Sequence, residues 1–359
     1  MFARRYLKRF LVAATAGFAF LWAPSSWAGP KTDFKVCWTI YAGWMPWDYA
    51  KRSGIMDKWA RKYGIKVDVV QLNDYVESIN QYSAGAFDGC TMTNMDALTI
   101  PAAGGVDTTA LIIGDFSNGN DGLVMKGDNK KIADLKGKQV NLVELSVSHY
   151  LLARALETQK MSERDVRVVN TSDADMVAAF KTKGVDTVVT WNPLLAEVMG
   201  TPKVSKLFDS SQIPGEIIDL MVVNTKTLNE NPNFGKALVG AWYEVMGIMS
   251  SKTPKAKEAL TQMATASGTD LKGFEAQLAA TRMFHSPKDA LEFATSKDLP
   301  GTMSKVAQFS FKHGLLGEGA KSAEAIGMQF PGSQTGNARN IKLRFDPSFM
   351  KLASDGQLK

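Results

Sequence analysis

The sequence predicts an α/β protein of two lobes, with mostly parallel sheets, a discontinuous first lobe and a second lobe inserted into it. Three observations favour this fold. Strand-like runs alternate with helix-like runs from residue 33 onward, which is typical of parallel strands joined by crossover helices. A second alternating set follows the run NDGLVMK, and a later apolar run precedes a long helical region. The length of 359 residues also exceeds that of a usual single domain.

The first alternating set begins the first lobe. In IKVDVVQL, the spacing of Val67, Val69 and Val70 indicates a buried strand, and Gly64 before it is typical of a helix end. The expected strands are 35–41, 66–72, 88–93 and 108–115, and the expected helices are 49–63, 75–84 and 95–103.

The second alternating set predicts the inserted lobe. An apolar run at 217–224 then returns the chain to the first lobe, where the pattern is helical from Asn233 to about Leu316. The expected strands of the inserted lobe are 139–143, 166–169 and 185–191, and its expected helices are 146–159, 174–181 and 193–199.

Two chain crossings, near 123–126 and 220–224, are expected to join the lobes. A cleft between lobes connected in this way can close around a ligand by a hinge motion. Two sequential domains of unrelated function are the alternative. The expected division is a first lobe of residues 33–124 and 221–330, a second lobe of 125–220, and a C-terminal extension of 331–359 in which 341–345 docks as a short strand.

Residues 1–28 resemble an export signal. Arg4, Arg5, Lys8 and Arg9 precede the apolar run LVAATAGFAFLWA, and Ser-Trp-Ala then predicts cleavage after Ala28 and a periplasmic location. The apolar run is shorter than the roughly 20 residues that span a bilayer, which favours a cleaved signal over a retained anchor. Removal of the four basic residues lowers the formal charge from +6 to +2. The remaining charge gives no indication of a nucleic-acid partner.

The cysteines and histidines indicate neither a metal centre nor catalysis. Cys37 and Cys90 each lie in an expected strand, and both a disulfide and two buried free thiols stay open. His149, His285 and His313 show no metal-ligand spacing, so no zinc site is expected. The sequence contains neither GxSxG nor a GxxxxGK[ST] phosphate loop. We therefore expect a protein that is not an enzyme and holds no cofactor.

Polar and aromatic side chains gather where expected strands give way to helices, most densely in KVCWTIYAGWMPWDYA. In an open α/β sheet these junctions line one crevice, which is where small ligands bind. Each residue alone has a structural alternative, as a helix cap, a helix-start acid or a core aromatic. The expected ligand-binding set is Trp44, Trp47, Asp48, Asn94, Asp96, Asp115, Glu144 and Trp191, with Thr93, Ser146, Ser148 and Asn192 beside them.

The acidic members of this set favour a cationic or amide ligand. Helix N-termini alone attract anions, but carboxylates at the same places repel them. Glu144 directly follows the expected strand QVNLV and precedes a helix start that could otherwise hold an oxyanion. Trp44, Trp47 and Trp191 could stack on a planar cation. Crowded carboxylates would raise at least one pKa, so cation affinity is expected to fall as the pH drops.

The chain from about residue 33 to residue 330 resembles the substrate-binding proteins of ABC importers in the nitrate, sulfonate and taurine family. The resemblance is carried by VCWTIYAGWMPWDYAKRSGIMDKWARKYGIKVDVVQLNDYVESINQYSAG, DGCTMTNMDAL, IIGDFSNGNDGLV and VTWNPLL. It implies a type II periplasmic binding fold, capture of a small-molecule ligand in the cleft, and delivery by a monomer to an ABC permease. By this resemblance, the expected ligand contacts are Trp44, Trp47, Asn94, Asp115, Glu144 and Trp191.

The resemblance is nearest to a branch described as urea or urea-carboxylase-associated binding proteins. Some enzymes associated with that branch act on guanidine, which makes guanidinium the preferred ligand, followed by urea. Paired carboxylates could engage guanidinium bidentately. Three alternatives stay open: an anion carrier of the nitrate, sulfonate or taurine type, a sensory module, and an enzyme similar to thiamine-pyrimidine synthases, whose cysteine-rich motif and reactive histidines this chain lacks.

Overall fold

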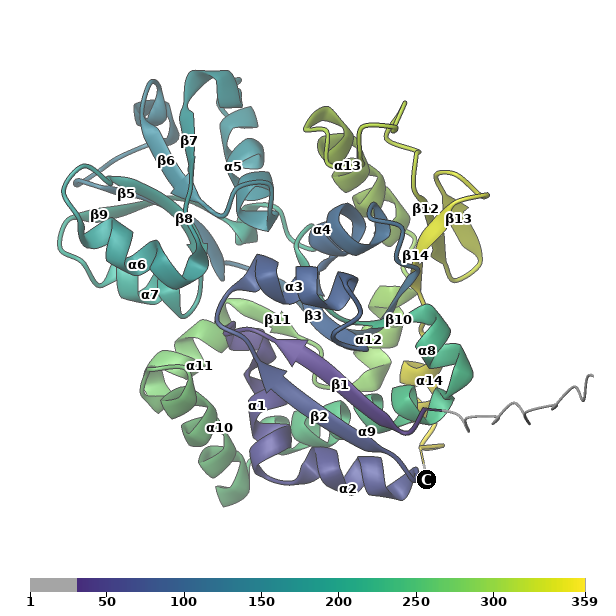
Figure 1. Cartoon of the computed structure of the whole chain (residues 1–359). Helices are drawn as coiled ribbons and strands as arrows, with labels where there is room; N and C mark the ends of the chain where they lie inside the picture. The colour runs from purple at the N-terminus through teal and green to yellow at the C-terminus, as the bar shows by residue number, and fades with distance from the viewer. Residues whose placement is uncertain (1–30, 359) are drawn as a thin grey trace, which may run out of the picture. The chain divides into compact units, whose positions relative to one another are not determined.

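The computed structural model describes residues 31–358, which hold two β-sheets with helices packed against them (Figure 1). The export signal predicted for residues 1–28 lies outside this range. Within the described residues, the first sheet has nine strands, in the order β13 (Ser333–Thr335), β12 (Gly327–Phe330), β14 (Ile341–Phe345), β4 (Thr108–Ser117), β10 (Ile218–Asn224), β3 (Gly89–Thr93), β1 (Asp33–Trp38) and β2 (Lys66–Gln71), with β11 (Thr281–Met283) beside β4. The second sheet has the order β7 (Arg167–Asn170), β6 (Gln139–Leu142), β8 (Thr187–Trp191), β5 (Asp121–Lys126) and β9 (Val204–Asp209).

The helices follow the same division. None of those found in residues 31–358 is both long and apolar enough to cross a bilayer. Between strands of the second sheet lie η3 (Ile132–Leu135), α5 (Val147–Glu157), η4 (Glu163–Asp165), α6 (Asp173–Lys181) and α7 (Leu194–Met199). The other helices are η1 (Ala42–Trp44), α1 (Met45–Arg52), α2 (Ile55–Lys62), α3 (Tyr75–Ser83), α4 (Asn94–Ala97), η2 (Leu98–Ala102), η5 (Ser210–Gln212), α8 (Thr225–Glu230), α9 (Pro232–Ser250), α10 (Pro254–Ala266), α11 (Leu271–Ala279), α12 (Pro287–Ala294), α13 (Leu299–Lys312) and α14 (Ser348–Ser354).

Both sheets are mixed, so the expectation of mostly parallel sheets needs correction. The strands β2, β1 and β3 are parallel, as are β7, β6 and β8. In contrast, β10 and β5 each run antiparallel to both of their neighbours. The reason is topological, because each of these strands directly follows a passage of the chain from one sheet to the other.

The predicted insertion of one lobe into the other is confirmed. The chain leaves the first sheet after Ser117 and enters the second at Asp121, then leaves the second after Asp209 and re-enters the first at Ile218. The two passages lie side by side, since the hydroxyl groups of Ser117 and Ser210 are 2.6 Å apart. A two-stranded connection of this kind permits hinge bending between lobes.

Several expected boundaries shift by a few residues. The predicted crossings at 123–126 and 220–224 lie inside β5 and β10, just beyond the points where the chain changes sheet. The expected helix at 49–63 is divided into α1 and α2, because Gly54 adopts a left-handed conformation with φ of 74° between them. The expected docking of 341–345 is confirmed, since β14 pairs in parallel with β4.

The open question about the cysteines is resolved by strand register. Cys37 of β1 and Cys90 of β3 occupy directly opposite positions in the parallel pair. Their Cα atoms lie 4.4 Å apart, and the two residues form a disulfide within the buried core. The bridge therefore links two neighbouring strands through cysteines that are 53 residues apart in sequence.

We expect replacement of both Cys37 and Cys90 by alanine to lower the free energy of unfolding by about 2–4 kcal/mol, because the bridge restricts the unfolded chain. Urea unfolding of the oxidised wild type and the double variant measures this difference. The wild type in the presence of a reductant is the matched control and should lose a similar amount. Equal stability of the oxidised and reduced wild type would contradict a structural role for the bridge.

Candidate functional site

The candidate site is built on a row of residues that crosses the first sheet. Asp219 of β10 pairs with Thr93 of β3 on one side and with Asp115 of β4 on the other. Side chains directly opposite in an antiparallel pair point to the same face of a sheet. The register therefore brings two carboxyl groups together in the protein interior, where Asp115 and Asp219 are 0% and 3% exposed.

The second sheet contributes a matching pair. Asp121, the first residue of β5, lies opposite Trp191, the last residue of β8. Asp121 is buried, and its backbone N–H donates to Oγ of Ser117 at 3.1 Å. The passage between the sheets therefore places Asp121 beside the row on the first sheet.

A small cavity lies between these two sets of residues. Its accessible volume is about 10 Å³. Such a volume accommodates about one water molecule in this conformation. No lysine or arginine of the described residues lines it; the lining consists of Tyr41, Trp44, Tyr75, Thr93, Asp121, Val147, Trp191 and Asp219.

Aromatic rings form the walls of the cavity. The ring of Trp44 lies 5.0 Å from that of Tyr41 and 5.8 Å from that of Tyr75, between centroids. Tyr75 in turn packs edge to face with Trp191 at 5.5 Å. The indole N–H of Trp191 donates to the carbonyl of Ile40, whereas that of Trp44 is buried without a partner among residues 31–358. An unpartnered buried donor at a cavity is a feature of ligand sites.

Gly43 allows the segment after β1 to approach the carboxyl row. A Cβ atom at this position would lie 2.5 Å from Oδ2 of Asp115, so only glycine fits without movement. The neighbouring Tyr41 hydroxyl donates to Oδ1 of Asp115 at 3.0 Å. Close backbone approach at Gly43 therefore lets the segment 41–44 contribute both aromatic rings and a hydrogen-bond donor.

The buried carboxyl groups accept few hydrogen bonds. Asp96 accepts from the hydroxyls of Tyr75 at 2.7 Å and Thr93 at 2.8 Å. One oxygen of each of Asp96, Asp115 and Asp219 has no partner within the part of the chain that the structure describes. Burial, with the Asp96 charge next to it, raises the pKa of Tyr75 well above its usual value, so this phenol stays a donor.

Burial is the main cause of the raised pKa values of all four carboxyl groups. It raises the pKa of Asp96 to about 6 and that of Asp121 to about 7. It also raises the pKa of Asp115, and it raises the pKa of Asp219 well above the usual value, where the charge of Asp115 adds to the effect. Ionising the whole set without a balancing cation is therefore unfavourable.

Hydrogen bonds around the cavity join segments that belong to the two sheets. The N–H of Ala42 donates to the carbonyl of Asn192 at 3.2 Å. The N–H of Tyr75, at the start of α3, donates to Oδ1 of Asp173 at 3.2 Å. These contacts hold residues from both sheets around the same small space.

Four of the eight residues predicted for the site converge on the cavity. Trp44 and Trp191 line it. Asp96 lies just behind it, since Asp96 accepts hydrogen bonds from two lining residues. Asp115 lies in the row beside Asp219 and accepts from a lining tyrosine.

The other four predicted residues lie elsewhere. Trp47 packs in the core against Trp242, at 5.1 Å between ring centroids. Asp48 pairs with Arg52 one helical turn later. The side-chain amide of Asn94 donates to the backbone carbonyl at 216 and accepts from the backbone N–H at 218. Glu144 is exposed and lies in a surface groove with Asp74, Glu77 and Asp173, because β6 ends one strand away from β5.

Sequence reasoning missed several lining residues. The strongest available signal was Asp219 within the otherwise apolar run IIDLMVVN, because a carboxyl group in a buried strand needs a special reason. No comparable signal marked the other residues that were missed, which are Tyr41, Tyr75, Asp121 and Val147.

A second, larger hollow does not share this chemistry. It is a surface groove beside the cavity, lined mostly by exposed or half-buried residues that include Asn73, Ala174, Glu197 and Gly268. Its lining lacks the combination of aromatic rings and fully buried carboxyl groups. We therefore assign the candidate site to the small cavity.

The two-sheet arrangement with an inserted second lobe is that of periplasmic binding proteins. The chain superposes on SsuA of Xanthomonas axonopodis pv. citri, an alkanesulfonate-binding protein bound to MOPS, with a TM-score of 0.67 and 17% identity over 81% of this chain and 96% of that one. It also superposes on the nitrate-binding protein NrtA of Synechocystis PCC 6803, with a TM-score of 0.66 and 13% identity over 91% and 90% of the two chains. Similarity at this level of identity establishes the fold alone.

The chain belongs to the NMT1/THI5-like family, whose sequence model matches residues 57–249. A protein of Brucella abortus described as a binding protein is 28% identical over 137 residues, which are 38% of this chain and 42% of that protein. The taurine-binding periplasmic protein of Escherichia coli K12 is 26% identical over 143 residues, which are 39% of this chain and 44% of that protein. The chain thus matches less than half the length of these curated relatives.

The raised pKa values predict that Asp219→Asn stabilises the ligand-free protein near pH 8. A carboxyl group with a raised pKa in the folded state stabilises that state at low pH and loses this contribution as the pH rises through the folded pKa. Asparagine cannot ionise, so we expect a gain of about 0.5–2 kcal/mol near pH 8 and a smaller gain near pH 5, where less of the penalty has developed. Urea unfolding of dialysed protein at both pH values measures it.

Asp48→Asn is the matched control, because Asp48 pairs with Arg52 and its removal should not stabilise the protein. A gain for Asp219→Asn that is equal at both pH values would show that relief of charge at the carboxyl row is not the cause.

Proposed function

We propose that this protein is the substrate-binding component of an ABC importer and captures a small planar cation, guanidinium, in the cavity. One observation carries this proposal. Two buried carboxyl groups, Asp121 and Asp219, line an aromatic-walled space whose lining, within residues 31–358, includes no lysine or arginine. Two more, Asp96 and Asp115, are buried next to it and accept hydrogen bonds from lining hydroxyl groups. Urea is the second candidate.

Electrostatics favours a cation over an anion at this place. Ionised carboxylates in a low-dielectric interior repel one another and any anion, whereas a cation balances them. The faces of Trp44, Tyr75 and Trp191 add an attraction for a desolvated cation. An anionic ligand would instead require most of the carboxyl groups to stay protonated.

The size and hydrogen-bonding capacity of the site favour guanidinium in particular. Its flat shape presents N–H donors in several directions, and the carboxyl oxygens of Asp121 and Asp219, which line the cavity, are acceptors. The cavity holds about one water molecule in this conformation, so it would need to open to admit a ligand of a few heavy atoms. Urea has the same shape but no charge, so it would leave the carboxylates unbalanced.

The comparisons support a transport role. The family relatives described above are binding proteins, and the fold is shared with a nitrate-binding and an alkanesulfonate-binding protein. We infer that residues 1–28 direct export to the periplasm and that an ABC permease receives the ligand. The hinge between the lobes would then permit capture and release without any catalytic step, and the protein would act as a monomer.

Two alternatives compete with this proposal. The taurine-binding relative favours a carrier of sulfonates or other anions, and the buried carboxyl groups oppose it. The family description also contains a name shared with thiamine-pyrimidine synthases, but the cavity lining within the described residues offers no cysteine or histidine. Both alternatives are outcomes of the experiments below.

We expect guanidinium at low millimolar concentration to raise the melting temperature of the purified mature protein, and urea, nitrate and taurine to raise it less. Ligand binding to the folded state alone produces such a rise. Asp121→Asn should weaken guanidinium binding at least about tenfold, because it removes a buried charge at the cavity. Isothermal titration calorimetry measures the affinities.

Glu144→Gln is the matched control, since Glu144 is acidic but exposed outside the cavity. It should bind guanidinium as the wild type does. A selective response to taurine or nitrate would identify an anion carrier, and turnover of an added substrate would indicate an enzyme.

The pKa values predict that guanidinium binding strengthens as the pH rises. The pKa of Asp96 is about 6 and that of Asp121 about 7, so protons compete with the ligand below neutrality. We expect the affinity near pH 5.5 to be at least about tenfold weaker than near pH 7.5. Calorimetry at a series of pH values tests this, and a flat profile would contradict binding by the carboxyl groups.

A further inference from the structure

A second group of polar side chains converges outside the cavity. His149 lies on α5, Glu163 begins η4, and His313 directly follows α13. The Nε2 atom of His149 lies 2.9 Å from Oε1 of Glu163, and Nε2 of His313 lies 3.1 Å from the same oxygen. One nitrogen or oxygen from each residue lies within 4.8 Å of the others.

These three atoms are close together but do not satisfy one another. All three are shielded from solvent, and none has a hydrogen-bond partner of acceptable geometry in residues 31–358. The separations of 2.9 and 3.1 Å are short enough for hydrogen bonds, so it is the angle at the ring nitrogens that is unfavourable. Buried polar atoms without hydrogen bonds indicate that a bound partner, such as an ion, is missing.

We propose that His149, Glu163 and His313 bind a divalent transition-metal ion of the zinc type. Two imidazole nitrogens and one carboxylate oxygen form a common ligand set for zinc, with water as the fourth ligand. An ion between the three atoms would be a common partner for both ring nitrogens and the carboxylate oxygen. The expectation of no zinc site came from sequence spacing, and these ligands are too far apart in the chain to form a spacing motif.

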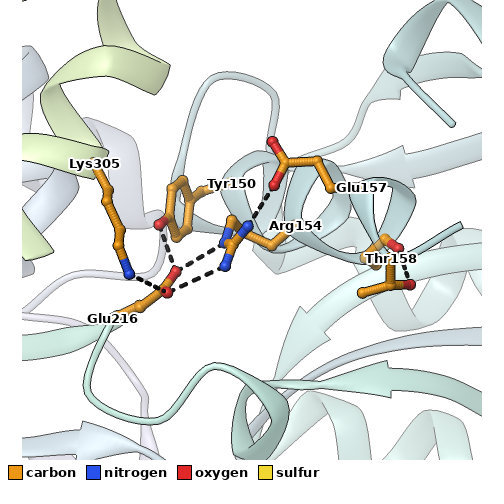
Figure 2. A network of polar contacts seen from close by, with 7 residues as sticks. Tyr150, Arg154, Glu157, Thr158, Glu216 and Lys305 are labelled. Carbon is orange, nitrogen blue, oxygen red and sulfur yellow. Dashed lines mark hydrogen bonds and ion pairs between the residues drawn. The ribbon is translucent and has the colours of Figure 1, made fainter. Parts of the chain in front are cut away.

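The scaffold holds the three side chains near one another without the metal. Lys305, Phe309 and His313 recur every four residues along α13 and onto the residue after it, and therefore share one face. The ring of Phe309 packs edge-on against Tyr150 of α5 at 5.1 Å between centroids. Lys305 contacts Glu216 at 3.4 Å, and Figure 2 shows Glu216 held from the other side by α5.

The ion-pair network around Glu216 holds α5 and α13 together. Its carboxylate accepts from Arg154 Nε at 2.9 Å and from the Tyr150 hydroxyl at 2.6 Å (Figure 2). Burial alone would raise the pKa of Glu216, but the hydrogen bonds from Arg154 and Tyr150 hold it below its usual value. Glu216 therefore stays ionised and keeps α5 and α13 together, which preorganises the metal ligands.

One contact must change when the metal binds. The N–H of Leu145 donates to Nδ1 of His149 at 3.1 Å, which places the proton of a neutral His149 on Nε2. A metal on Nε2 moves that proton to Nδ1, so the Leu145 bond opens. Leu145 is 42% exposed in a turn, where water can take over the freed N–H. A shift of the Leu145 amide resonance on metal addition would report this change.

The test is titration of EDTA-treated mature protein with zinc chloride by calorimetry, together with the visible absorption of added Co²⁺. We expect saturable binding of one ion per chain. Glu163→Gln and His313→Ala should each weaken it at least about tenfold. His285→Ala is the matched control, since His285 is exposed and lies outside the cluster, and it should bind as the wild type does.

Glu163 and His313 are half-buried, so their variants avoid the larger packing loss expected at His149. Cooperative urea unfolding confirms that each variant folds, and a variant that fails this check is replaced by His313→Gln. Failure of the wild type to bind one ion saturably, or equal binding by wild type, Glu163→Gln and His313→Ala, would overturn the proposal. The result is independent of guanidinium binding, because the two sites share no residue.

Discussion

The desolvation of four carboxyl groups is the constraint on which the rest of the site depends. Water is excluded from Asp96, Asp115, Asp121 and Asp219, and few donors replace it. A folded protein tolerates such a group only as a neutral acid or beside a positive charge. Stability is thus given up locally at the cavity, while the surrounding sheets and the Cys37–Cys90 bridge supply it elsewhere.

The aromatic walls and the carboxyl groups serve different purposes within this constraint. Trp44, Tyr75 and Trp191 keep water out and define a narrow space, which strengthens every electrostatic interaction inside it. The hydroxyl donors of Tyr41 and Thr93 orient Asp115 and Asp96. Selectivity would then depend on charge and size together, since a bulky cation fits the charge but not the space.

The success and failure of sequence reasoning have a common physical cause. Trp44 and Trp191 were identifiable because Trp44 follows β1 and Trp191 ends β8, at the carboxyl ends of strands, where α/β sheets bind ligands. Asp121 and Asp219 escaped this rule because they lie at the amino ends of β5 and β10, which run antiparallel to their neighbours. The fold class could be predicted from the alternation of strand-like and helix-like runs. The direction of a strand after the chain changes sheet depends on the tertiary structure, so the positions of Asp121 and Asp219 could not be predicted. The histidine cluster likewise joins three distant segments without any local pattern.

The position of β10 has a consequence for assembly of the chain. In the first sheet β10 lies between β3 and β4, yet it is synthesised only after the whole inserted lobe. Until residues 218–224 arrive, β3 and β4 have no strand between them, and the edges that they turn toward it are open to hydrogen bonding. Such edges invite pairing with other chains, and closing them requires a contact between residues far apart in sequence. A newly made chain therefore passes through an aggregation-prone stage that lasts at least until this central strand is inserted, which also completes the carboxyl row.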